Sequence, residues 1–167
     1  ECSGDPVYAT AVVSEAMDAG LKIVTMDSEL QITSGSWLAK KGLITEAEGD
    51  QPGSIAALHK EVLAMGFEPI VLGNIKGFLN HTPVKDEMKY WANRQGISLD
   101  QVTSFTDGTK IQIEQTLVAN GLGASIAQQG MLGVECVDYQ DGAKRLAERA
   151  DNLGVKISDY VLSPKSP

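Results

Sequence analysis

The stretch Thr103–Asn120, TSFTDGTKIQIEQTLVAN, decides how the rest of the chain is interpreted. It is long enough for several helical turns, and the residues from Ser104 to Asp107 have the composition of a helix start. Gly121 follows at the place where a left-handed residue typically ends a helix. The sequence therefore predicts one helix from this start to Asn120.

Three ionisable residues share one side of that helix with its apolar residues. At about 100° per residue, Asp107, Lys110 and Glu114 fall on the same side as Ile111 and Val118. Ionisable groups on the buried side of a helix must pair, shift their pKa or face a cavity. Two interpretations follow: a buried ion-pair ladder, or a helix that faces an active-site cleft.

Composition limits the classes of protein to consider. The chain has 167 residues, of which 43% are hydrophobic, enough for a sizeable core. Its net charge of −8 argues against nucleic acid or an anionic membrane as a partner. No apolar run approaches the ~18 residues that a membrane span requires. Two cysteines, Cys2 and Cys136, are too few for a disulfide framework. Because such a composition fits a reducing compartment, we expect a cytoplasmic protein.

The first residues are typical of half a parallel α/β unit. ECSGDP resembles a strand end that leads directly into a helix, with Asp5 as N-cap and Pro6 at the first helical position. A short buried strand, Leu21–Met26, follows that helix. We expect Glu1 to about Asp5 to lie at a sheet edge beside this strand, in a fragment that lacks an N-terminal portion.

The pattern predicts further elements along the chain. They are a short helix at 34–42 capped by Ser34 or Ser36, a strand at 43–47, an acidic turn at 48–53, a helix at 54–65 burying Ile55, Leu58, Val62 and Met65, a strand at 67–72, a polar loop at 73–81, and helices at 84–95 and 140–153.

Four polar clusters interrupt this pattern, at residues 2–5, 48–51, 74–80 and 106–114. The first three follow predicted strands, and ligands usually bind at that carboxyl edge of an α/β sheet. Lys76 is flanked by glycines; it is either placed to reach a bound oxyanion or an ordinary surface lysine. We expect the clusters to converge, so that Lys76, Asp107 and Lys110 line one cleft.

Three motifs resemble those of an oxidoreductase family: GDQPG at 49–53, GNIKGFLN at 73–80 and TSFTDGTK at 103–110. This homoserine-dehydrogenase-like family includes the second class of deoxyxylulose phosphate reductoisomerases, and its members commonly carry a C-terminal SAF domain. The resemblance implies an α+β catalytic domain joined to a Rossmann-type NAD(P)-binding domain. Residues 1–47 would be the C-terminal part of a truncated Rossmann-like domain, 48–160 the catalytic domain, and 161–167 a linker.

The resemblance also implies a function and a set of site residues. The expected activity is NAD(P)-dependent oxidation or reduction of a small polyhydroxylated carbonyl or alcohol, with isomerisation coupled to it in the reductoisomerase-like case. Expected catalytic residues are Lys76, Asp107 and Lys110. Expected substrate-binding residues are Glu48, Asp50, Gln51, Asn74, Asn80, Thr106, Thr109 and Glu114. Expected residues for NAD or NADP are Cys2, Ser3, Gly4, Asp5, Met26 and Asp27.

Several alternatives stay open at this point. Glu48, Asp50 and Glu114 have the oxygen ligands that Mg²⁺ or Mn²⁺ prefers, although we assign no metal site. The chain is otherwise a sugar- or nucleotide-binding regulatory module without turnover. A third reading is a dimerisation scaffold that uses the sheet face and Trp37 or Trp91. The partners we expect are a small-molecule substrate and further copies of the chain.

Overall fold

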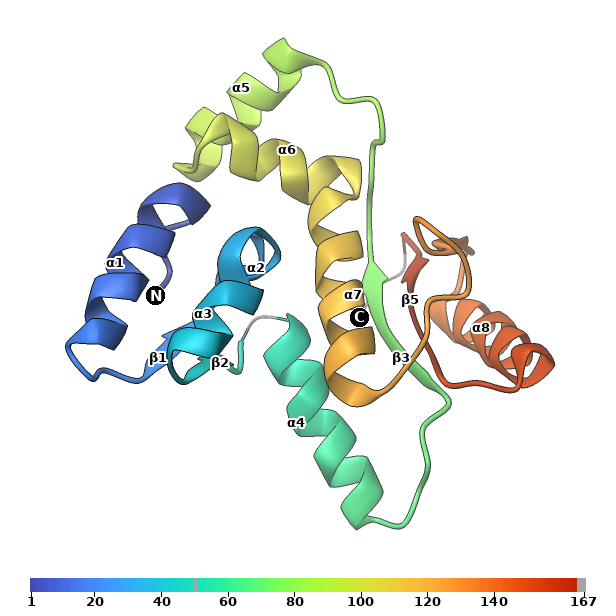
Figure 1. Cartoon of the computed structure of the whole chain (residues 1–167). Coiled ribbons are helices and arrows are strands. Elements are labelled where there is room, and N and C mark those ends of the chain that lie inside the picture. The colour runs from blue at the N-terminus through green and yellow to red at the C-terminus, as the bar shows by residue number, and fades with distance from the viewer. Residues whose placement is uncertain (50, 165–167) are drawn as a thin grey trace. The chain divides into compact units, whose positions relative to one another are not determined.

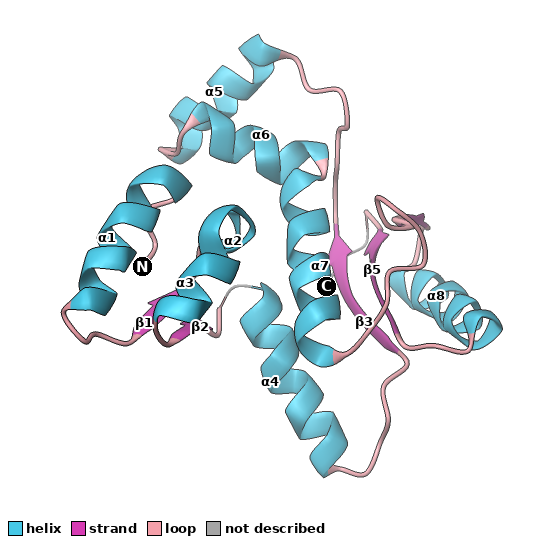
Figure 2. Ribbon diagram, in the orientation of Figure 1, coloured by secondary structure: helices cyan, strands magenta, loops and turns pink. Residues whose placement is uncertain are grey.

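The computed structural model describes residues 1–49 and 51–164, and the chain divides into two compact units, Glu1–Ser54 and a second that begins at Ile55. Both units combine helices with short parallel strands, which confirms the predicted α/β class (Figure 2). The division falls after Ser54, whereas the sequence suggested a boundary at 47/48. Asp50 and the last three residues of the expected linker lie outside the described residues. Within residues 1–49 and 51–164, no helix is both long and apolar enough to cross a bilayer.

The first unit is a parallel strand pair covered by helices (Figure 1). Helix α1 (Pro6–Asp18) precedes β1 (Ile23–Thr25), and β1 pairs in parallel with β2 (Ile44–Glu46). The Asp5 carboxylate accepts two backbone N–H groups of the first helical turn, each at 3.0 Å, so the predicted N-cap is confirmed. Pro6 suits the first position because its nitrogen has no hydrogen to donate.

Glu1 lies beside β1, as the sequence predicted. Its amino group donates to the Val24 carbonyl at 2.7 Å, and the Met26 N–H donates to the Glu1 carbonyl at 3.0 Å. These two bonds are the pattern of a parallel pair opposite Thr25. The Thr25 hydroxyl strengthens the pairing by donating to the Glu1 carboxylate at 2.9 Å.

The helical region after β1 is longer than predicted. It consists of α2 (Ser28–Leu30), a π-helical turn (Gln31–Gly35) and α3 (Ser36–Lys41). The prediction of a cap at Ser34 or Ser36 is wrong, because the Asp27 carboxylate already accepts the Leu30 N–H at 3.0 Å. The core of this unit is formed by Ala9, Val13, Met17, Ile23, Leu30 and Leu38.

Helix α4 (Gln51–Ala64) begins three residues before the predicted start at Ser54. Pro52 is tolerated there because the first turn of a helix needs no backbone donor. The prediction that α4 buries Leu58 and Met65 is also wrong, since both are exposed. The helices α7 (Thr109–Leu122) and α8 (Tyr139–Leu153) provide the contacts to the sheet of the second unit instead.

The second unit contains a three-stranded parallel sheet in the order β3 (Val71–Lys76), β5 (Ile157–Leu162), β4 (Val134–Glu135). The strand expected at 67–72 lies further along the chain, because hydrogen bonding to β5 from Val71 to Lys76 defines β3. Lys76 is therefore the last residue of a strand and not part of a loop. Val161 and Leu162, expected to belong to a linker, form the end of the central strand.

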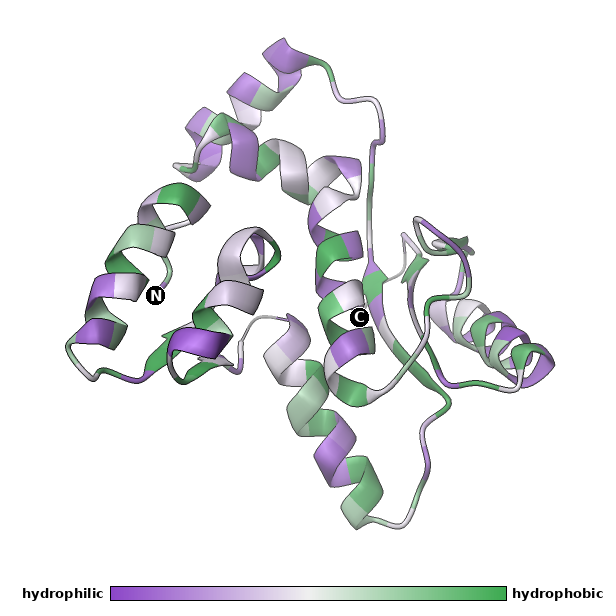
Figure 3. Ribbon diagram, viewed as in Figure 1, coloured by the Kyte–Doolittle hydropathy of each residue, from purple (hydrophilic) through white to green (hydrophobic). Residues whose placement is uncertain are grey.

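Two helices pack on opposite sides of β3 and β5 (Figure 1). Alternate residues of β5 face α8, and its Ile157 and Val161 form a core with Leu146 and Ala150. The other face of β5 meets α7, where the Ser158 hydroxyl hydrogen-bonds to Gln115 at 2.7 Å. Helix α8 alternates hydrophilic and hydrophobic residues along its length, which fits one buried side (Figure 3).

The stretch Thr103–Asn120 belongs to two helices and not to one. Helix α5 (Lys85–Gln95), as predicted, precedes α6 (Leu99–Asp107) and α7. Gly108 separates α6 from α7 with a left-handed φ of 93°, a conformation that disfavours side chains. Asp107 thus ends α6 and does not share one helix face with Lys110 and Glu114. The C-cap of α7 is Gly123 and not Gly121, because the helix extends to Leu122.

Candidate active site

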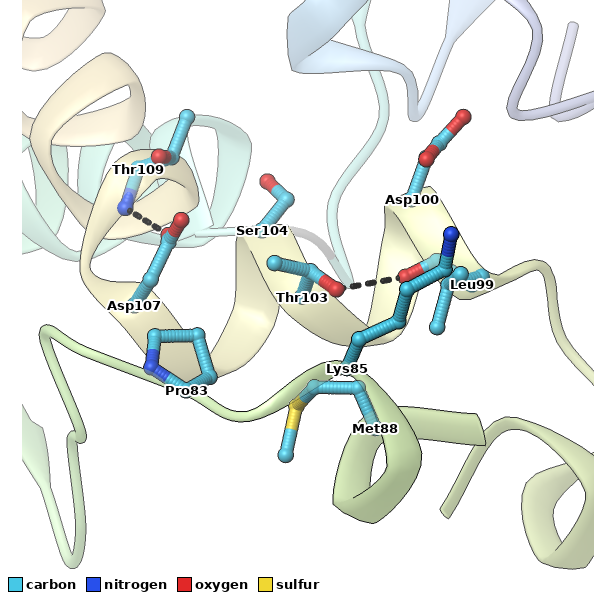
Figure 4. Close-up of a pocket in the computed structure, with 9 residues that line it drawn as sticks. All are labelled: Pro83, Lys85, Met88, Leu99, Asp100, Thr103, Ser104, Asp107 and Thr109. Atoms are coloured by element: carbon cyan, nitrogen blue, oxygen red, sulfur yellow. Dashed lines mark hydrogen bonds between the residues drawn. The ribbon is translucent and has the colours of Figure 1, made fainter. Parts of the chain in front are cut away.

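An open cavity of about 530 Å³ lies beside α5 and α6 of the second unit (Figure 4). This volume falls within the usual range of small-molecule sites, roughly 300–1,000 Å³. The lining combines hydroxyl, charged and apolar side chains, in contrast to an ordinary core. Its residues are Pro83, Lys85, Met88, Leu99, Asp100, Thr103, Ser104, Asp107 and Thr109.

Helix α6 presents a polar stripe to the cavity. Asp100, Thr103, Ser104 and Asp107 are spaced i, i+3, i+4 and i+7, so they lie on one face of the helix (Figure 4). Val102 instead packs on the buried residues of α5. This packing fixes the rotation of α6, and therefore the direction of its polar stripe.

A capping box holds the start of α6. The Ser98 hydroxyl accepts the Gln101 N–H at 3.1 Å, and the Gln101 side chain accepts the Ser98 N–H at 3.2 Å. Reciprocal bonds of this kind satisfy two backbone donors that the helix cannot satisfy itself. The Thr103 hydroxyl donates to the Leu99 carbonyl at 2.7 Å, which leaves its oxygen lone pairs for other donors (Figure 4).

Asp107 is held from two directions at the junction between α6 and α7. Its carboxylate Oδ1 accepts the Thr109 N–H at 2.8 Å, and its carbonyl accepts from His81 Nδ1 at 2.8 Å. Because a carbonyl can only accept, Nδ1 of His81 carries the proton. The Asn80 N–H donates to the neighbouring Thr106 carbonyl at 2.8 Å. The segment Leu79–Pro83 therefore fastens the junction that carries Asp107.

Lys110 and Glu114 form an ion pair within α7. Their side chains approach to 3.2 Å, with Lys110 16% and Glu114 1% exposed. The Lys110 ammonium also lies 5.4 Å from the centre of the Phe105 ring, within the range of a cation–π contact. Lys110 does not belong to the cavity lining described above. One rung of the expected ion-pair ladder is thus present, and the cavity lies beside its other predicted member, Asp107.

The remaining predicted substrate residues of the second unit occupy several environments. Thr109 lines the cavity, whereas the Thr106 hydroxyl donates to the Val102 carbonyl at 2.7 Å. Asn80 accepts the Thr82 N–H at 3.0 Å, and Asn74 lies within β3. The Lys76 carbonyl accepts the Ser163 N–H at 2.8 Å at the end of the same strand.

In the first unit, Glu48 is exposed and Gln51 begins α4. Asp50 lies outside the described residues, so its predicted role has no structural counterpart. Their roles, like those of Lys76 and Lys110, stay predictions.

The residues predicted to bind the cofactor lie at the carboxyl end of β1 and in the segment that follows Glu1. Cys2 is exposed, the Ser3 N–H donates to the Glu1 carboxylate at 2.7 Å, and Gly4 has a left-handed φ of 71°. Asp5 caps α1 with its carboxylate, while Met26 is exposed. Strand ends of this kind are the usual ligand edge of a parallel sheet.

Asp27 is the most unusual residue of this group. It is buried, and within the described part of the chain its Oδ2 has no hydrogen-bond partner. Burial raises the pKa of the Asp27 carboxyl, and the nearby Glu1 and Glu29 carboxylates raise it further. The Oδ2 atom is itself closed off from solvent, so it is an enclosed acceptor and not an exposed one. It does not fit a pyrophosphate, which requires donors.

The described residues contain no group of three or more His, Cys, Asp or Glu placed to hold a metal ion. Glu48 and Glu114 belong to different units, and Asp50 is outside the described ranges.

Most of the cavity lining was not predicted as site residues from the sequence, namely Pro83, Lys85, Met88, Leu99, Asp100, Thr103 and Ser104. A signal for them was present in the sequence. Ser98 and Gln101 have capping-box spacing, and they precede polar residues at i, i+3, i+4 and i+7. A helix that starts at Leu99 would have placed these residues together. The stripe was not predicted because the helix was expected to begin at Ser104–Asp107, which leaves Asp100 and Thr103 outside it.

Comparison with known proteins adds a family to this geometry. Comparison with curated proteins finds no match. Residues 49–163, most of the chain, match the family model described as "Oxidoreductase DRL, catalytic domain". This range contains every residue that lines the cavity, together with the Lys110–Glu114 pair. The chain therefore belongs to the oxidoreductase DRL family, of which it carries the catalytic domain.

Proposed function

We propose that the protein is an NAD(P)-dependent oxidoreductase that acts on a small polyhydroxylated carbonyl or alcohol. The observation that carries the proposal is the position of Asp107, which lines a cavity of suitable size inside the range matched by the oxidoreductase family. The resemblance to reductoisomerase-like enzymes adds a substrate with several hydroxyl groups. The polar stripe of α6 suits such a substrate because it offers oxygen atoms to several hydroxyls at once.

Asp107 is the residue best placed to exchange a proton with the substrate. A carbonyl that is reduced needs a hydride on carbon, which a reduced nicotinamide supplies, and a proton on oxygen. The Oδ1 atom of Asp107 is engaged by the Thr109 N–H, which leaves Oδ2 for the substrate. We assign Asp107 the role of proton relay. Lys76 and Lys110 remain the candidates for stabilising the negative charge that develops on oxygen.

The strand-end residues of the first unit are the proposed contacts of the cofactor. Asp27, the N-cap of α2 at the end of β1, is the proposed contact of the ribose hydroxyls. Gly4 and Met26 flank the same strand end. The pyrophosphate would need backbone donors at a helix N-terminus, as in the glycine-rich loops of dinucleotide-binding domains. The sequence of the chain contains no such glycine fingerprint.

The test is turnover by the full-length protein with NADH and NADPH in parallel, on a panel of small aldoses and ketoses. Asp107→Asn keeps the cap on Thr109 through its amide oxygen but cannot relay a proton. We expect its turnover to fall about 10²-fold or more, the scale of losing a general acid or base. Asp86→Asn is the control, because Asp86 is exposed and does not line the cavity. Equal turnover by the Asp107 variant and the wild type would contradict the assigned role.

A regulatory module without turnover is the second candidate function. The Lys110–Glu114 pair is compatible with it, since this pair gives Lys110 a partner within α7 and needs no substrate to hold it in place. Binding of a sugar without oxidation or reduction of any nicotinamide cofactor by the full-length protein would establish it.

A further inference from the structure

The junction between α6 and α7 sets the direction of the Asp107 side chain. Asp107 is the last residue of α6, Gly108 follows with its left-handed φ of 93°, and Thr109 begins α7. Asp107 and Thr109 both line the cavity, and the Thr109 N–H donates to Asp107 Oδ1 at 2.8 Å (Figure 4). The carboxylate therefore keeps its place only while the backbone on both sides of Gly108 keeps its geometry.

The segment Leu79–Pro83 holds this junction through the last carbonyls of α6. The Asn80 N–H donates to the Thr106 carbonyl at 2.8 Å, and His81 Nδ1 donates to the Asp107 carbonyl at 2.8 Å. The last four carbonyls of a helix have no partner within the helix, so these two bonds satisfy two of them. The His81 bond is made by a side chain to the carbonyl of Asp107 itself.

The ring of His81 also lies directly against Gly108. A methyl group on Gly108 would be 3.0 Å from His81 Cε1 and 3.2 Å from Nδ1. Both distances are shorter than an ordinary contact of about 3.5–4.0 Å between carbon atoms, so the ring takes the space that a side chain would need. The absence of a side chain at Gly108 thus permits both the left-handed φ and the approach of the imidazole.

Leu79 anchors the same segment in the core of the second unit. It packs against a buried cluster that consists of Ile111, Met131 and Tyr160. Ile111 belongs to α7 and Tyr160 to the central strand β5. His81, two residues further along, is therefore carried by backbone that the core and the end of α6 both hold.

We infer that His81 is a positioning residue for Asp107. Its Nδ1–H holds the Asp107 carbonyl and its ring supports the backbone at Gly108, so the carboxylate keeps the direction in which it lines the cavity. The inference rests on the proposed function, in which Asp107 relays the proton. His81 is not among the residues that line the cavity described above, so it acts through Asp107.

Turnover of the full-length protein tests this role. His81→Leu removes the donor, whereas His81→Asn keeps a side-chain N–H close to the position of Nδ1. We expect kcat of His81→Leu to fall about 10-fold to 10²-fold with KM changed by less than about twofold, because a misplaced relay affects the transition state more than substrate binding. His81→Asn should recover most of this loss. An unchanged kcat in His81→Leu would overturn the inference, and so would equal losses in both variants.

A double variant shows whether His81 acts through Asp107. Once Asp107→Asn has removed the relay, His81→Leu should lower kcat little further, because residues that act as one unit are not additive. Independent effects would instead multiply, and that result would overturn the inference.

Amide hydrogen exchange tests the geometry without cofactor or substrate, on isotope-labelled full-length protein observed by NMR. His81→Leu should speed exchange of the Thr109 N–H about tenfold, the ratio that corresponds to losing one hydrogen bond of ordinary strength. An unchanged rate would overturn the inference. Gly154→Ala is the control for general loss of stability. Gly154 is the left-handed C-cap of α8 with a φ of 66°, and no atom lies within 4 Å of the added methyl group.

The control should lower the urea midpoint but leave kcat and the exchange of Thr109 unchanged. A fall in kcat in Gly154→Ala as large as in His81→Leu would assign the effect to stability and overturn the inference. The inference and the proposed function fail with different results. Wild-type turnover by Asp107→Asn removes the proton relay and the role of His81 with it. Slow turnover by Asp107→Asn together with full turnover by His81→Leu overturns the role of His81 alone.

Discussion

Replacing Lys110 by Met should destabilise the second unit strongly. The substitution keeps the length and apolar surface of the side chain, but it removes the Lys110 ammonium from beside the Glu114 carboxylate, which is 1% exposed. At 3.2 Å and an effective dielectric constant of about 20, the direct attraction is of order 5 kcal/mol. Breaking such a pair from one side costs roughly 3–5 kcal/mol. We expect about 3 kcal/mol, since Lys110 retains some contact with water.

Glu114→Gln should cost less than Lys110→Met. It removes the buried charge itself, and the remaining Lys110 ammonium is 16% exposed and can turn toward water. We expect about 1 kcal/mol, the usual net value of a lost hydrogen bond. The double variant should resemble Glu114→Gln and not the sum of both changes, because the two residues interact directly. This order of stabilities distinguishes a buried pair from two independent surface charges.

Urea unfolding measures these differences. Trp91 is the only tryptophan of the second unit, so its fluorescence in a Trp37→Phe background reports that unit. With a slope of about 1–3 kcal/mol per molar urea, 3 kcal/mol lowers the midpoint by about 1–3 M. A loss below about 1 kcal/mol in Lys110→Met would refute the reasoning, because the pair would then be no stronger than an exposed one. Turnover measured on the same variant decides whether Lys110 also acts in catalysis.

Three further outcomes follow from individual residues. Gly142→Ala in α8 should destabilise the second unit by about 1–3 kcal/mol, because the new methyl group would lie 2.5 Å from Val161 Cγ1. This loss should exceed the gain from the higher helix propensity of alanine. A higher urea midpoint would contradict the prediction. In the wild type the pKa of the Asp27 carboxyl is raised, so its ionisation costs folding stability as the pH rises from the ordinary pKa of 3.8 through the folded pKa. Asp27→Asn keeps an N-cap and removes this ionisation. The variant should therefore be more stable than the wild type at pH 7 and similar in strong acid, and equal midpoints at pH 7 would speak against it. Gly108→Ala should cost about 1 kcal/mol or more through its left-handed φ and a 3.0 Å approach to His81 Cε1, and it should shift the amide resonances of α6; unchanged spectra and stability would show that the junction tolerates a side chain.

Local sequence signals determined the helices whose ends are marked by capping residues. Helix α1 begins where Asp5 and Pro6 predict it, and α5 ends at a left-handed glycine, Gly96. Helix α8 spans its predicted range to within one residue. Caps and helical periodicity act between residues a few positions apart, so they can be recognised without knowing the rest of the fold. The three sequence motifs likewise lie within residues 49–163, the range matched by the oxidoreductase family.

Long-range contacts decided the features that local sequence patterns predicted incorrectly. β5 is a short central strand with polar residues buried inside it, and pairing with β3 and β4 on its two edges defines it. The break at Gly108 depends on the loop at residues 79–83, whose Asn80 and His81 hydrogen-bond to the end of α6. No local pattern announces a partner more than twenty residues away.

The candidate site shows the same division between sequence and structure. The polar stripe of α6 is present in the sequence as four residues at helical spacing, and so is the Lys110–Glu114 pair. Only the tertiary structure decided that the stripe lines a cavity, because Val102 packs on α5 and turns the opposite face of α6 outward. Spacing fixes which side chains share a face, whereas the direction of that face depends on what the helix packs against.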